Sequence, residues 1–81
     1  MTEIILNDLM DSRRVTIAKI DKEFTPETAK RIVNRFMPAI AKELLIGEGI
    51  VDFMDSETGE ITIQYKVCGM FSGNWNITRL S

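Results

Sequence analysis

The sequence predicts an α+β fold: a two-layer sandwich in which one amphipathic helix packs on a mainly antiparallel sheet. Three observations predict it. Residues 25–45 carry apolar side chains at helical spacing, several shorter stretches are β-branched or alternate apolar with polar residues, and polar or glycine-containing turns separate them. The expected order is strand, strand, helix, strand, strand, strand. At 81 residues the chain is expected to form one domain, 1–81.

The first element is open between two interpretations. Residues 3–10, "EIILNDLM", form either a strand that pairs with residues 15–20 through a turn near Asp11 and Ser12, or a helix capped by Thr2. The compact apolar run of residues 4–6 between polar neighbours favours the strand. Residues 15–20, "VTIAKI", are rich in β-branched side chains and predict the second strand.

The helix has clear start signals. Thr25 is a good N-cap, Pro26 suits the first helical position, and Glu27 faces the positive end of the helix dipole. At 100° per residue, one side is apolar and the other polar. The apolar side carries Ala29, Ile32, Val33, Phe36, Ile40 and Leu44, and the polar side carries Glu27, Lys30, Arg31, Asn34, Arg35 and Lys42.

The same stretch predicts a bend and an end. Pro38 removes one internal hydrogen bond and is expected to bend the helix, and the angular count places it on the polar side. Gly47 and Gly49 offer stop signals after Leu45.

A hairpin and a last strand follow. "GIVDFMD" at 49–55 and "EITIQYKVC" at 60–68 flank the turn, where Gly59 supplies a positive φ angle. The second arm alternates apolar and polar residues, as a half-buried strand does. "NWNITRL" at 74–80 predicts a last strand whose Trp75 and Ile77 share one face, and we expect that face to be core.

Composition argues against several chemistries. The chain has no histidine and one cysteine, which removes Ser–His and Cys–His catalysis, an internal disulfide and most zinc ligands. It also has no phosphate-binding loop. We therefore expect no enzyme, no cofactor and no metal site. A cluster of acids is interpreted as a solvated hairpin turn, and carboxylate-based catalysis stays open as a lesser alternative; the acids are Glu48, Asp52, Asp55, Glu57 and Glu60.

The cellular compartment is predicted from the signals that the sequence lacks. The N-terminal residues have no export signal, the thiol is single, and the apolar runs are too short to span a bilayer, so we expect a cytoplasmic protein with no membrane contact. The size and mixed composition are those of small accessory proteins of bacteria and their phages, an association that no motif carries.

The preferred function is a small binding or regulatory module that works through protein contacts, with a protein partner or as a homodimer. Its candidate partner-binding residues are Met70 and Phe71, because adjacent residues in extended backbone point in opposite directions and at least one should reach solvent. Ordinary packing of both residues is the alternative. An exposed sheet edge is a second candidate docking surface.

The alternative function is binding of nucleic acid. The outer side of the predicted helix carries no acid between Thr28 and Lys42, and its cations are suited to following phosphates. The candidate residues are Arg13, Arg14, Lys30, Arg31, Arg35 and Lys42. The basic helix side and the acidic hairpin are also complementary, which favours self-assembly or steering of a charged partner.

Overall fold

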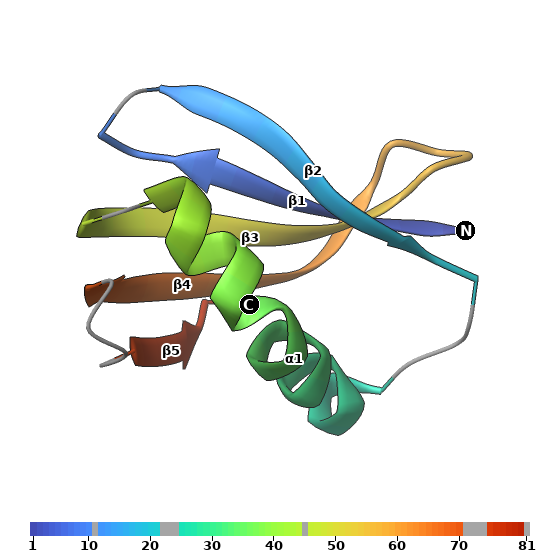
Figure 1. Ribbon diagram of the computed structural model, residues 1–81. Coiled ribbons are helices and arrows are strands. Elements are labelled where there is room, and N and C mark those ends of the chain that lie inside the picture. The colour runs from blue at the N-terminus through green and yellow to red at the C-terminus, as the bar shows by residue number, and fades with distance from the viewer. Residues whose placement is uncertain (11, 22–24, 45, 71–74, 81) are drawn as a thin grey trace.

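One helix lies across one face of a five-stranded antiparallel sheet (Figure 1). The computed structural model describes residues 1–10, 12–21, 25–44, 46–70 and 75–80, and at Ile46 and Met70 the backbone alone. The elements are β1 (Thr2–Asp8), β2 (Arg13–Ile20), α1 (Pro26–Leu44), β3 (Ile46–Asp55), β4 (Ile61–Met70) and β5 (Trp75–Arg79). The predicted fold class and element order are confirmed.

The sheet has the strand order β2-β1-β3-β4-β5, and all four pairings are antiparallel. The first element is therefore the strand, and it lies inside the sheet between β2 and β3. Its side chains Ile4 and Leu6 are buried beneath α1 because alternate residues of a strand point to the same face. The turn to β2 includes Ser12, whose φ is 52°. Strands β2 and β5 form the two edges.

Helix α1 begins at a reciprocal cap. The N–H of Thr28 donates to Oγ1 of Thr25 at 3.3 Å, and the N–H of Thr25 donates to Oγ1 of Thr28 at 2.7 Å. These two bonds form a capping box in which threonine replaces the usual glutamate. They satisfy backbone donors that a helix start leaves without intrahelical partners.

The predicted apolar side of α1 faces the sheet. Its buried residues are Ala29, Val33, Met37, Ile40, Ala41 and Leu44, of which Met37 and Ala41 were not predicted. Ile32 and Phe36 are partly buried against the same core. Pro38 is exposed, as predicted, and the ribbon of α1 changes direction along its length (Figure 1). A proline within a helix is a known cause of such a bend.

The core lies between α1 and the inner face of the central strands. β3 and β4 contribute Val51, Phe53, Ile63, Tyr65 and Val67, all almost fully buried. Trp75 and Ile77 of β5 are partly buried and pack against this cluster, which confirms the predicted face of the last strand.

Gly49 and Gly59 occupy positions that disfavour any residue with a Cβ atom. Gly49 was predicted as a helix stop but lies within β3, where an added Cβ would stand 2.9 Å from Leu6 Cδ1 and 3.2 Å from Leu44 Cδ2. Glycine at this position therefore lets the end of α1 pack closely on β1 and β3. Gly59 in the β3–β4 turn has a φ of 74°, which confirms its predicted role.

No helix in the described parts of the chain combines the length and the apolar composition that crossing a membrane requires.

Candidate functional site

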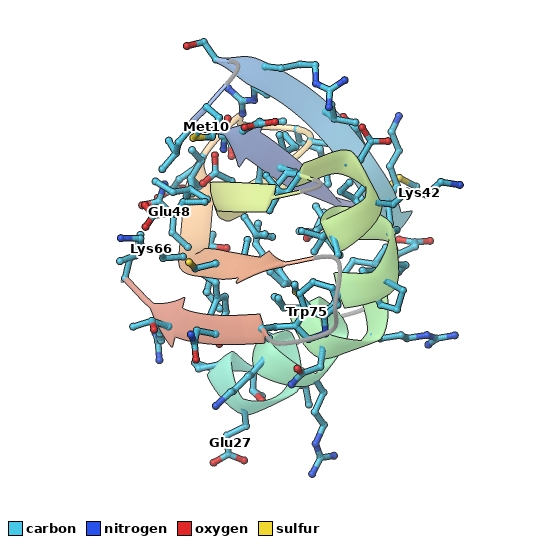
Figure 2. The ribbon with its side chains drawn as sticks, turned by 60° about the vertical axis from the view of Figure 1, so that its left-hand side comes forward. Met10, Glu27, Lys42, Glu48, Lys66 and Trp75 are labelled. Atoms are coloured by element: carbon cyan, nitrogen blue, oxygen red, sulfur yellow. The ribbon has the colours of Figure 1, made fainter. Side chains whose placement is uncertain are left out.

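A groove of about 510 Å³ lies between the first turns of α1 and strand β5. In both views this end of the helix extends past β5, with Glu27 at the far end (Figures 1 and 2). The groove falls within the roughly 300–1,000 Å³ of typical ligand sites. It is lined by Pro26, Glu27, Lys30, Arg31, Asn34, Tyr65, Ile77 and Arg79.

The rim of the groove is mainly positive. Lys30 and Arg31 project from α1, and Arg79 projects from β5 on the other side. Glu27 is the one carboxylate among the described lining residues. All four charged side chains are exposed, so the groove presents an excess of cations to solvent. This arrangement suits an anionic ligand.

The floor of the groove is apolar and fixed in place. Tyr65 is buried, its ring lies 6.3 Å from that of Phe53, and its hydroxyl donates to the carbonyl of Pro26 at 3.1 Å. This hydrogen bond connects β4 to the first residue of α1. Ile77 adds half-buried apolar surface beside it. The hydroxyl of Tyr65 therefore positions the helix above the floor.

Strand β5 leaves part of its backbone facing away from the rest of the sheet. The N–H of Leu80 donates to the carbonyl of Gln64 at 2.9 Å, and Arg79 pairs with Tyr65 in the β4–β5 register. In an antiparallel ladder, residues whose N–H and C=O meet the neighbouring strand alternate with residues whose groups point away. The backbone groups of Trp75 and Ile77 consequently point away from β4, across the open edge of the sheet.

The structure separates the predicted basic residues into groups. Lys30, Arg31, Arg35 and Lys42 are all exposed on the outer side of α1. Arg13 instead lies at the other end of the helix, where its guanidinium donates to Glu43 Oε2 at 3.1 Å and to the Glu43 carbonyl at 3.2 Å.

Arg14 does not share a face with the helix either. It pairs with Asn7 on the opposite face of the sheet, and its Nη2 lies 3.9 Å from Met54 Sδ. The six candidate residues for nucleic-acid binding therefore do not form one stripe: four follow α1, one contacts its C-terminal end, and one lies on the far face.

Of the two predicted partner-binding residues, the structure describes Met70, which lies at one end of the sheet. The backbone of Met70 ends β4 opposite Ile46, and Phe71 lies outside the described residues. At this same end the β1–β2 turn presents Leu9 and Met10, with 50% and 73% of their surface exposed. Sequence reasoning missed this pair as a surface feature. Two adjacent apolar residues beside a turn were the available signal.

One of the five acidic residues does not lie in the solvated hairpin turn that the sequence predicted for them. Asp52 is buried on the face opposite the helix, where its carboxylate accepts hydrogen bonds from Asn7 Nδ2 at 2.7 Å and Gln64 Nε2 at 2.8 Å. The solvated-turn interpretation is therefore wrong for Asp52, because its two neighbouring strands supply amides that cover it.

The other acids lie nearer to solvent. Glu48 and Lys66 approach to 3.5 Å on the outer face of the sheet (Figure 2). Asp55 shapes the turn by accepting from the N–H of Glu57 at 2.8 Å. Within the described ranges, no group of three His, Cys, Asp or Glu side chains is placed to hold a metal ion.

Comparison with known protein families, with curated proteins and with solved structures finds no match for this chain.

Proposed function

We propose that this protein is a small non-enzymatic binding module that works in the cytoplasm through protein contacts, holding an acidic segment of its partner in the groove. The observation that carries the proposal is the placement of Lys30 and Arg31 opposite Arg79 above an apolar floor. Cations at the rim attract and orient an acidic segment, while the apolar floor packs against the methylene groups of its side chains.

A binding role agrees with the chemistry of the lining residues. Glycosidase-type catalysis needs two carboxyl groups placed across a bond, and Glu27 is the one carboxylate among the described residues that line the groove. Histidine is absent from the whole chain. The hydroxyl of Tyr65 is already bonded to Pro26. The groove therefore offers charge, shape and apolar contact in place of acid–base pairs.

Nucleic-acid binding is the second candidate. It is favoured by the four exposed cations Lys30, Arg31, Arg35 and Lys42 on the outer side of α1. One observation makes it the weaker one. The six candidate cations do not form one stripe, since Arg13 contacts Glu43 at the C-terminal end of α1 and Arg14 lies on the opposite face of the sheet.

Selection from a random peptide library tests the proposal. We expect the wild-type protein to enrich acidic peptides and the double variant Lys30→Glu/Arg31→Glu to lose them. Arg35→Glu/Lys42→Glu is the matched control, because it makes the same charge change on the same helix but outside the groove lining. Circular dichroism should show that both variants fold.

The outcomes separate the two candidates. Acidic peptides that bind both variants equally well, or no enrichment at all, would contradict the proposed function. Binding of a single-stranded oligonucleotide that falls steeply with salt and is lost in Arg31→Glu/Arg35→Glu would favour nucleic acid instead.

A further inference from the structure

We infer that the acidic segment binds as an added β-strand: it extends the sheet by pairing antiparallel with the open edge of β5, beneath the overhanging N-terminal half of α1. This inference rests on the proposed function and specifies its mode. It predicts which positions of the partner must be acidic and which of its backbone amides must stay unblocked.

The backbone of β5 supplies the first step. β5 pairs with β4 on one side and is the last strand of the described sheet. The N–H and C=O of Trp75 and Ile77 point away from β4, as the β4–β5 register and the bond from Leu80 to Gln64 require. An extended segment that approaches this edge finds donors and acceptors at strand spacing. Strand addition of this kind derives affinity from main-chain bonds and specificity from alternate side chains.

The position of the helix supplies the second step. Directly opposed residues of an antiparallel pair point to the same face of a sheet. The side chain of Ile77 faces the helix layer, where it packs against the core and lines the groove. The partner residue opposite Ile77, and the residues two positions before and after it, therefore also face α1. Lys30 and Arg31 stand on that side.

The two steps together give a sequence rule for the partner. Acidic residues should recur at every second position over about five residues, since β5 spans Trp75–Arg79. The acidic residues are also the ones whose main-chain groups bond to β5, because their side chains share the face of Ile77. Charge recognition and backbone recognition thus fall on the same partner residues.

The experiment uses the synthetic peptide Thr-Glu-Thr-Glu-Thr-Glu-Thr, acetylated, amidated and labelled for fluorescence anisotropy. Two derivatives differ only in the position of one N-methyl group: on the central glutamate, or on the threonine that follows it. N-methylation of the glutamate blocks a bond to β5 and should weaken binding at least about ten-fold. N-methylation of the threonine, whose amide points away from β5, should change the affinity less than about two-fold.

Amide hydrogen exchange gives an independent readout. The peptide should slow exchange of the Ile77 amide, which faces the open edge. The amide of Asn76, which pairs with Cys68 within the sheet, is the matched internal control and should change little. Lys30→Glu/Arg31→Glu should lose the peptide, and Arg35→Glu/Lys42→Glu should retain it.

The alternatives give different results. Equal binding of the two N-methylated peptides, with unchanged exchange at Ile77, overturns strand addition but leaves the proposed function standing if the library selection succeeds. Absence of peptide binding at low salt, together with failure of that selection, overturns both.

Two further results would assign the groove to another occupant and overturn the inference. One is a salt-sensitive oligomer, seen by sedimentation, that must dissociate before the peptide binds. This result would indicate that the groove holds the acidic Asp55–Glu60 turn of a second copy of the chain. The other is an oligonucleotide that displaces the peptide and binds more tightly than it does.

Discussion

Gly49→Ala tests how closely the C-terminal end of α1 packs on the sheet. An alanine Cβ at this position would lie 2.9 Å from Leu6 Cδ1, 3.1 Å from the backbone oxygen of Asn7 and 3.2 Å from Leu44 Cδ2. The two leucine side chains can rotate, but the backbone oxygen moves only with β1. The substitution therefore overpacks a site where the helix meets β1 and β3.

The cost can be worked from these contacts. Overpacking of a core usually costs about 1–3 kcal/mol, and contact with backbone places this site in the upper part of that range. Replacing glycine by alanine within a strand by itself raises the free energy of unfolding by about 0.5–1 kcal/mol. We therefore expect the free energy of unfolding to fall by about 2 kcal/mol, which lowers the melting temperature by roughly 8–16 °C for a domain of this size.

Urea titrations followed by circular dichroism and by the fluorescence of Trp75 measure this loss. Leu6→Val removes the atom nearest to the new methyl group, so the double variant should lose at least about 0.5 kcal/mol less than the sum of the single variants. Gly59→Ala is the control. Its φ is 74° and an added Cβ meets nothing within 4 Å, so it should cost about 1–2 kcal/mol for left-handed backbone without coupling to Leu6. The packing argument is wrong if Gly49→Ala unfolds with the same free energy as the wild-type protein. It is also wrong if the losses of Gly49→Ala and Leu6→Val add strictly in the double variant.

Three further substitutions test the cap, the buried carboxylate and the predicted apolar contact. Thr25→Ala removes the N-cap and should cost about 1 kcal/mol in thermal unfolding, whereas Thr25→Asn should keep most of the stability. Asp52→Ala leaves the amides of Asn7 and Gln64 without their carboxylate and should cost about 1–3 kcal/mol, against less than about 0.5 kcal/mol for the exposed Glu57→Ala. Phe71→Ala should leave unfolding nearly unchanged while weakening association with a partner protein; a loss of about 3–5 kcal/mol with unchanged association would instead indicate a core residue.

The local elements of this protein could be predicted because their signals are local. Thr25 and Pro26 predict the start of the helix, and the 100° period of its residues distinguishes the apolar side from the polar side. Gly59 permits the hairpin turn because glycine can adopt the positive φ angle needed there. Each signal acts within a few residues, so no tertiary information is needed to interpret it. Gly49 is the counterexample, because its role depends on Leu6 and Leu44 and not on its neighbours in sequence.

By itself the sequence determined the class of fold, the order of the elements and the buried side of α1, and helical periodicity placed Lys30 and Arg31 on the polar side of that helix. The groove itself was not predicted. Tertiary structure decided that β1 is an inner strand, that Asp52 is covered by amides from β1 and β4, and that Arg79, Ile77 and Tyr65 face the start of the helix. The physical reason is the range of the interactions: caps, turns and amphipathic periods act between neighbours, whereas the β1–β3 pairing and the packing of α1 on the sheet join residues tens of positions apart. That packing brought the cations of two distant segments together over one groove.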